Sequence, residues 1–175
     1  VKLTYADYAV IPPDGRVWQV LDGEAIVMPV PSPQHQRASK RLQRQLEAFF
    51  EATGKGEVFD APIDLILGPH DVTQPDVAVV TDPATVTRRG IEAPPLLVVE
   101  VLSPSTAAYD REAKARRYAA LGVPHDWILD PDAQRLECWR NDAGTYVLSA
   151  GATGDQTLAS PDFESLTIDL AAIWR

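Results

Sequence analysis

The sequence predicts an α/β (α+β) fold in which a mixed β-sheet is flanked by helices. Two runs of apolar, largely β-branched residues, 77–80 and 96–102, are typical of strands that are covered on both faces. A helical segment from Asp110 to Leu121 separates the second run from another strand at 127–130, and such alternation is typical of helices packed on a sheet. Residues 1–175 are expected to form a single domain, because neither a linker nor an internal repeat divides them.

The N-terminal half is expected to supply a hairpin and a long helix. Asp22-Gly23 is a strong signal for a two-residue hairpin turn. Ser32 as N-cap and Pro33 at the first helical position predict where the long helix begins. In order, the expected elements are an arm or short helix over 1–13, strands over 17–21 and 24–28, a helix over 32–53, and strand segments over 57–59 and 63–67.

The C-terminal half is expected to contain most of the sheet. Asp110 is predicted to cap the second helix, which Gly122 and Pro124 end. The other expected elements are a turn at 68–71 leading to the strand that Asp76 opens, a polar connection over 82–94, paired strands over 135–140 and 145–148, a loop over 151–161, and a last strand or short helix over 166–174.

Composition narrows the class of protein. No apolar run is long enough to span a membrane, and the first residues lack a basic region followed by an apolar stretch, so a cytoplasmic protein without a membrane partner is expected. The single Cys138 rules out an internal disulfide framework, and with three histidines a structural zinc site is not expected.

The charge of the chain is acidic overall but uneven. A formal net charge of −9 argues against a protein that coats nucleic acid nonspecifically, because phosphate binding depends on Lys and Arg. Two local groups of basic residues could still contact nucleic acid. An ordinary solvated helix face explains each group equally well. They are Arg37, Lys40, Arg41 and Arg44 in one segment and Arg111, Lys114, Arg116 and Arg117 in another.

A carboxylate in the apolar 96–102 strand is the most informative local feature. Burying the ionised side chain of Glu100 costs several kcal/mol unless a cation or a set of hydrogen bonds compensates it. Lys114 shares a helix face with Tyr118, so its side chain is predicted to point toward the sheet. Asp76 follows Pro75 and stands at the start of another apolar strand. The two acids and the lysine predict a cation site.

These residues stand in motifs that resemble the Uma2 family of the PD-(D/E)XK nuclease superfamily. The resemblance covers nearly the whole chain and is specific as a combination. It rests on Leu21-Asp22-Gly23-Glu24, Ser32-Pro33-Gln34-His35-Gln36, Pro75-Asp76, the run from Glu100 to Thr106, Lys114 with Tyr118, Gly122-Val123-Pro124, and the run from Trp127 to Pro131. It implies a restriction-endonuclease-like fold, a central mixed sheet flanked by helices.

The resemblance also implies a metal-dependent endonuclease that hydrolyses phosphodiester bonds of DNA. Asp76, Glu100 and the backbone carbonyl of Val101 would bind Mg²⁺ or Mn²⁺, which prefer hard oxygen ligands. Lys114 would orient the attacking water, because Leu102 occupies the position two residues after Glu100 where the superfamily's simplest pattern has a lysine.

Two further site residues follow from the resemblance, each with an open alternative. Glu24 would hold a water or act as a base; from the residues alone, an exposed position at a sheet edge is favoured. His35 would contact a ligand or a phosphate; a histidine bonded locally in a helix cap is an equal alternative.

Other interpretations of the whole chain also remain. Glu100 and Lys114 could form a structural ion pair, with Asp76 as a strand-end cap. The acidic charge favours a noncatalytic nucleic-acid-binding or assembly module that retains a relic nuclease site. Trp139, Tyr146 and Trp174 would suit a homodimer. No Gly-x-Ser-x-Gly or phosphate-loop motif points to another enzyme class.

Overall fold

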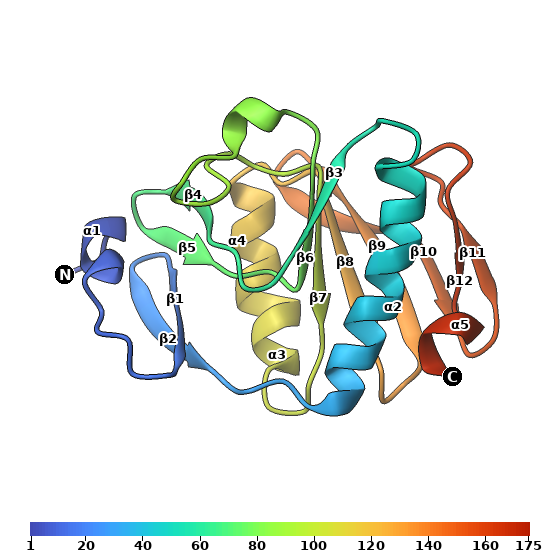
Figure 1. The fold of residues 1–175 in the computed structure, drawn as a ribbon, viewed down its shortest axis with the longest axis horizontal. Coiled ribbons are helices and arrows are strands. Elements are labelled where there is room, and N and C mark those ends of the chain that lie inside the picture. The colour runs from blue at the N-terminus through green and yellow to red at the C-terminus, as the bar shows by residue number, and fades with distance from the viewer.

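The centre of the fold is a six-stranded mixed sheet in a computed structural model that describes residues 1–175 (Figure 1). Its strands in spatial order are β10 (Thr145–Thr153), β9 (Arg135–Asp142), β8 (His125–Asp130), β7 (Leu97–Val101), β6 (Val77–Val80) and β3 (Glu57–Asp60). β7 and β8 are parallel, and all other neighbours in the sheet are antiparallel. The predicted mixed sheet flanked by helices is confirmed.

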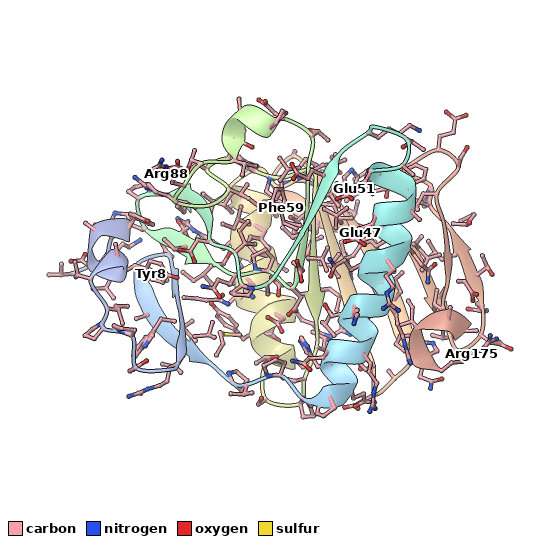
Figure 2. All side chains as sticks on the ribbon, viewed as in Figure 1. Tyr8, Glu47, Glu51, Phe59, Arg88 and Arg175 are labelled. Atoms are coloured by element: carbon pink, nitrogen blue, oxygen red, sulfur yellow. The ribbon has the colours of Figure 1, made fainter.

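Helix α2 (Pro33–Phe50) covers one face of this sheet and forms the larger part of the core. The Ser32 hydroxyl accepts a hydrogen bond from the His35 backbone N–H at 3.1 Å, as expected for the predicted N-cap. Leu42, Leu46 and Phe50 are buried at spacings of four residues. They belong to a cluster of 20 buried apolar residues, and side chains fill the space between α2 and the strands (Figure 2).

A second helical segment covers the opposite face between β7 and β8. It consists of α3 (Ala107–Tyr109), a π-helical turn η2 (Asp110–Lys114) and α4 (Ala115–Ala120). The prediction that Asp110 caps this helix is wrong: the helix begins one turn earlier, and the backbone N–H of Asp110 already donates to the Thr106 carbonyl at 2.9 Å. The Asp110 carboxylate is therefore buried in the interior, where it is available for other contacts.

A four-stranded sheet lies beside the central one. Its order is β2 (Glu24–Met28), β1 (Val17–Leu21), β5 (Asp71–Thr73) and β4 (Leu65–Gly68), which confirms the predicted hairpin and adds β5, which was not predicted. The three residues of β5 are too few to show a clear alternation of apolar and polar side chains. The buried Asp71 carboxylate accepts from the Arg117 guanidinium at 2.7 and 2.8 Å and so ties this sheet to α4. The short helix α1 (Tyr5–Ala9) is anchored by the Tyr8 hydroxyl, which donates to Asp64 at 2.7 Å.

The C-terminal region is more ordered than the sequence suggested. The predicted loop over 151–161 is wrong, because β10 continues to Thr153 and β11 (Thr157–Ala159) pairs with β12 (Thr167–Asp169). Leu158 and Ile168 face each other in this pair and are both buried, which stabilises two strands of only three residues. Helix α5 (Ala171–Trp174) ends the chain, and the 82–94 connection contains only the short η1 (Pro83–Thr85). No helix combines the length and hydrophobicity that crossing a bilayer requires.

Candidate active site

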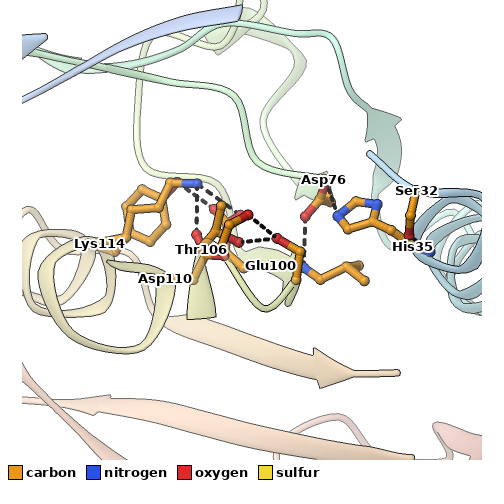
Figure 3. A network of polar contacts seen from close by, with 11 residues as sticks. Ser32, His35, Asp76, Glu100, Thr106, Asp110 and Lys114 are labelled. Carbon is orange, nitrogen blue, oxygen red and sulfur yellow. Dashed lines mark hydrogen bonds and ion pairs between the residues drawn. The ribbon is translucent and has the colours of Figure 1, made fainter. Parts of the chain in front are cut away.

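A polar pocket of about 340 Å³ lies where the N-terminus of α2, the start of β6, the end of β7 and the turn η2 meet. Its lining includes five of the six residues that the sequence predicted for the site: His35, Asp76, Glu100, Val101 and Lys114. Asp110 and Thr106 complete the network of contacts (Figure 3). The fold thus brings together side chains that are more than 60 residues apart in the chain.

Glu100 is buried and is bonded on both carboxylate oxygens. Its side chain is 3% exposed; Oε2 lies 3.0 Å from Lys114 Nζ, and Oε1 accepts a hydrogen bond from the Tyr118 hydroxyl at 2.9 Å. Burial raises the pKa of Glu100 well above its usual value; Lys114 opposes this rise, whereas the charges of Asp110 and Asp76 add to it. The partner that the sequence required for Glu100 is therefore Lys114, as predicted.

Lys114 is a buried cation that faces more than one carboxyl group. Its side chain is 1% exposed, and Nζ lies 3.5 Å from Asp110 Oδ1 as well as 3.0 Å from Glu100. Burial lowers the pKa of Lys114, but the surrounding carboxylates outweigh burial and hold the pKa above its usual value. Burial also raises the pKa of Asp110. The pocket lining contains three carboxyl groups, of Asp76, Glu100 and Asp110, against the single lysine.

Asp76 connects the strands to α2. Its Oδ2 accepts a hydrogen bond from the Val101 backbone N–H at 2.7 Å, and its Oδ1 lies 3.4 Å from His35 Nε2. Burial lowers the pKa of His35, but the hydrogen bond and the charge of Asp76 raise it, and the net pKa is above the usual value. The other ring nitrogen of His35, Nδ1, is buried without a hydrogen-bond partner.

The donor set of this pocket fits a hard divalent cation. The repulsion among Asp76, Glu100 and Asp110 that raises the pKa of Glu100 would be relieved by added positive charge. No group of three His, Cys, Asp or Glu side chains is arranged to hold a metal alone. Magnesium ordinarily binds proteins through one or two carboxylates and keeps several waters, so Asp76 and Glu100 with the Val101 carbonyl suffice in number.

Comparison with known proteins places this chain in a family. The model of the Uma2 family, described as "Putative restriction endonuclease", matches residues 5–171. The chain belongs to the Uma2 family. The uncharacterized protein slr1290 of Synechocystis is 35% identical over 133 residues, which cover 74% of this chain and 70% of that protein.

A solved structure shows that the Uma2 chain shares its fold with a further protein. A protein of the DUF820 group from Anabaena variabilis, described as a putative nuclease, superimposes with a TM-score of 0.77 over 98% of this chain and 97% of its own. At 18% sequence identity the match supports the restriction-endonuclease-like fold and not the roles of single residues. Family and fold together indicate a restriction-endonuclease-like nuclease.

Glu24, which the resemblance to the Uma2 family implied as a site residue, does not line the pocket. Glu24 is exposed at the hairpin end of the edge strand β2, opposite Leu21, and is absent from the pocket lining. The residue of this strand that lines the pocket is Met28, at the other end of β2. The position agrees with the alternative interpretation, an exposed residue at a sheet edge.

Three polar residues in and behind the pocket are not among the site residues that the sequence predicts. The sequence predicts a helix cap at Asp110, although its spacing of four residues from Lys114 is also a signal for a contact. Gln19 is 2% exposed in β1 and lines the pocket with an unpartnered Oε1; a polar residue inside an apolar strand was its signal. Helical spacing predicts the correct face for Tyr118 but not its hydrogen bonds to Glu100 and Thr73.

Proposed function

We propose that this protein is a metal-dependent endonuclease that hydrolyses phosphodiester bonds of DNA. The observation that carries the proposal is the convergence of Asp76, Glu100 and the Val101 backbone with the buried Lys114 in one pocket. Asp76 and Glu100, together with the Val101 carbonyl, would hold Mg²⁺ or Mn²⁺. When bound, the ion would stabilise negative charge on the phosphate and acidify a water.

Lys114 supplies the positive charge that the chain itself brings to the reaction. Its ammonium group is fixed between Glu100 and Asp110 at 3.0 and 3.5 Å, so its position costs no rearrangement when substrate enters. An ammonium group has three donors and two of them have carboxylate partners here, which leaves one direction for a water or a phosphate oxygen. Lys114 is thus proposed to orient the attacking water, from the helix rather than from the strand.

His35 and the acidic groups of the pocket have supporting roles in this proposal. The first turn of α2 carries His35, and a helix N-terminus favours anions. Because Asp76 raises the pKa of His35, the ring carries more positive charge near neutrality than a free histidine would. His35 would therefore contact a phosphate and keep Asp76 oriented.

An adjoining groove supports nucleic acid as the substrate. A polar cavity of about 470 Å³ runs along α2 from His35 and Asp76. Its lining includes the exposed cations Lys40 and Arg44 and also the acids Glu47 and Asp60. Only one of its lining residues is hydrophobic. Local cations beside the catalytic pocket allow phosphate contacts even though the whole chain is acidic, so the DNA backbone is proposed to follow this groove.

The test is cleavage of supercoiled plasmid by the wild type, Asp76→Asn and Glu100→Gln, each with Mg²⁺, with Mn²⁺ and with EDTA. Wild-type protein is expected to nick the plasmid only with metal, and both variants are expected to lose cleavage while remaining folded by circular dichroism. Asp132→Asn, an exposed carboxylate on the turn after β8, is the matched control and should cut normally.

Two results would contradict the proposal. Cleavage that persists in both variants would remove the chemistry from this pocket. A wild-type protein that binds DNA without cutting it under any metal condition would instead support the noncatalytic module.

Two further readouts address the substrate and the oligomeric state. A parallel assay on single-stranded RNA of matched sequence separates DNA from RNA as the substrate. Full linearisation of the plasmid in one encounter would support a homodimer.

A further inference from the structure

A second cavity, distinct from the catalytic pocket, lies on the other side of the same helix. It measures about 330 Å³, within the range of small-molecule sites, and is formed by η2, α4 and strands β8 to β10. Arg111, Ala115 and Ala119 of the helix line this cavity, whereas Asp110 and Lys114 line the catalytic pocket. Neither the family match nor the proposed nuclease chemistry gives this cavity a role.

The cavity contains a buried carboxyl group with an unsatisfied oxygen. Asp126 is 1% exposed, lines the cavity, and its Oδ1 has no hydrogen-bond partner. Most buried polar side-chain atoms in proteins have a partner, so an exception in a cavity points to a ligand or to water. Burial raises the pKa of Asp126 well above its usual value, with Lys114 opposing the rise. A neutral carboxyl group can donate one hydrogen bond and accept another.

Two aromatic rings in the wall are held in place by their polar ends. The Trp139 indole N–H donates to Glu137 Oε2 at 3.1 Å, and the Tyr146 hydroxyl donates to the Val123 carbonyl at 2.9 Å. Their ring surfaces remain available to the cavity, and both side chains are only partly buried. Ile128 adds a further apolar surface. The wall therefore suits a flat, partly apolar ligand.

The rim of the cavity carries charges of both signs, and Arg116 and Glu112 are exposed there. Arg111 is held by Glu137, whose two carboxylate oxygens accept from its guanidinium at 2.9 and 3.2 Å, so its charge is compensated. Arg116 is exposed at the same rim and extends toward solvent. A ligand that carries a phosphate outside the cavity would meet Arg116 there.

We propose that this cavity binds the nucleobase of a nucleotide. The Asp126 carboxyl bonds the donor–acceptor edge of the base, Trp139 and Tyr146 contact its ring, and Arg116 faces its phosphate. A hydrogen-bonding base edge, a flat ring and an adjoining anion are the three features that the lining matches. The base comes either from a free nucleotide or from a nucleotide turned out of a bound strand; only the second source rests on the proposed function.

The experiment is calorimetric titration of nucleoside 5′-monophosphates, one base at a time, into metal-free protein with EDTA. At least one of them is expected to bind the wild type in a 1:1 ratio. Asp126→Leu is expected to weaken that binding by about tenfold or more, because the edge contact is lost. Asp132→Leu, the same change at an exposed site, is the matched control and should bind as the wild type does.

Two further variants test the phosphate contact and the independence of the cavity from the nuclease site, and a stability measurement checks that Asp126→Leu is folded. Arg116→Gln changes an exposed side chain and should weaken the monophosphate but not the corresponding nucleoside, which lacks the phosphate. Glu100→Gln should keep nucleotide binding although it loses cleavage, so failure of the cavity and failure of the nuclease site can be told apart. Asp126→Leu removes a buried carboxyl group that has an unpartnered oxygen, and the thermal midpoint of this variant should be at least that of the wild type.

The source of the base is resolved by an oligonucleotide that carries 2-aminopurine, whose fluorescence rises on unstacking. A rise with wild type that disappears with Asp126→Leu assigns the cavity to a base from the strand, and its absence beside tight monophosphate binding assigns it to free nucleotides. The proposal is overturned if no monophosphate binds the wild type, or if Asp126→Leu binds it equally well. The cavity would then hold only water.

Discussion

The two faces of the six-stranded sheet bury different kinds of side chain, although the same strands form both. Beneath α2, the strands present Val99, Trp127 and Leu129 to a continuous apolar cluster. On the face beneath α4, the same strands present Glu100 and Asp126, both buried. Because successive residues of a strand point to opposite faces, each acid is next in sequence to an apolar core residue. Apolar clusters lie on both faces, but only the face beneath α4, called the polar face below, also presents buried carboxyl groups.

Burial of apolar side chains and burial of charged ones affect the free energy of folding in opposite directions. Apolar burial stabilises a fold roughly in proportion to area, at about 25 cal/mol per Å². Burying an ion pair such as Glu100 with Lys114 is often neutral or unfavourable compared with a hydrophobic replacement, although breaking the pair is costly. A second buried acid, Asp126, has an oxygen without any partner. The polar face is therefore better explained by function than by stability.

The largest effect is expected from Lys114→Met on the polar face. This change leaves Glu100 and Asp110 without their cation and should lower the free energy of unfolding by about 3–5 kcal/mol at neutral pH, with loss of cleavage. Urea denaturation and plasmid cleavage measure the two effects. Lys55→Met, an exposed change, should alter stability by no more than about 0.5 kcal/mol. A Lys114→Met protein that cuts plasmid at the wild-type rate would refute its role.

A comparable loss of stability is expected on the apolar face, but without a loss of chemistry. Leu46 of α2 is fully buried against the sheet, and Leu46→Ala should destabilise the fold by about 2–5 kcal/mol through the cavity it leaves. Cleavage per folded molecule, measured well below the thermal midpoint, should remain at the wild-type level. If cleavage by the folded protein fell as far as it does in Lys114→Met, the division between the two faces would be wrong.

A smaller effect is expected at the edge of the polar pocket, in the pKa of His35. Because Asp76 raises the folded-state pKa of His35, the stability from this pair is present below the unfolded pKa of about 6.5 and is lost as pH rises through the folded value. NMR titration of the ring proton should give a pKa above that of free histidine. Added Mg²⁺ should lower it, because a cation at Asp76 competes with the protonated ring. A pKa unchanged by Mg²⁺ would place the metal elsewhere.

The smallest effect is expected for Glu24→Ala. Glu24 is exposed at the hairpin end of β2 and lies outside the pocket, so its removal should change stability by no more than about 0.5 kcal/mol. Cleavage and Mn²⁺ affinity should also be unchanged. Loss of metal-dependent cleavage in this variant, with the fold intact, would show that the hairpin closes over the pocket during the reaction.

The sequence predicted the parts of the site that depend on local pattern. Alternation along 96–102 placed Glu100 inside the sheet, and helical spacing turned Lys114 toward it; the structure has both features. Ser32 and Pro33 marked the start of α2 and so placed His35 in its first turn. In these cases a few consecutive residues determine which way a side chain points.

The sequence failed where distant contacts or very short strands decide the outcome. Aspartate is a residue type preferred at helix N-caps, which is why the sequence predicts a cap at Asp110. The helix begins at Ala107 instead, and the Asp110 carboxylate faces Lys114. The strand over 157–159, in the segment predicted as a loop, is stabilised by its pairing with 167–169, which no local pattern shows. Asp126 Oδ1 lacks a hydrogen-bond partner because of how the helical segment η2–α4 and the strands β8, β9 and β10 meet around one cavity. Only the folded chain reveals such an arrangement.

Calorimetric titration of Mn²⁺ into the wild type, Asp76→Asn, Glu100→Gln and the control Asp132→Asn tests most directly whether the polar face holds a metal. The wild type and the control are expected to bind Mn²⁺ with the same affinity. Each pocket variant should bind it about tenfold or more weakly, because one carboxylate ligand is lost. Equal Mn²⁺ affinity in all four proteins, or no binding by the wild type, would contradict the assignment and leave Glu100 and Lys114 as a structural ion pair.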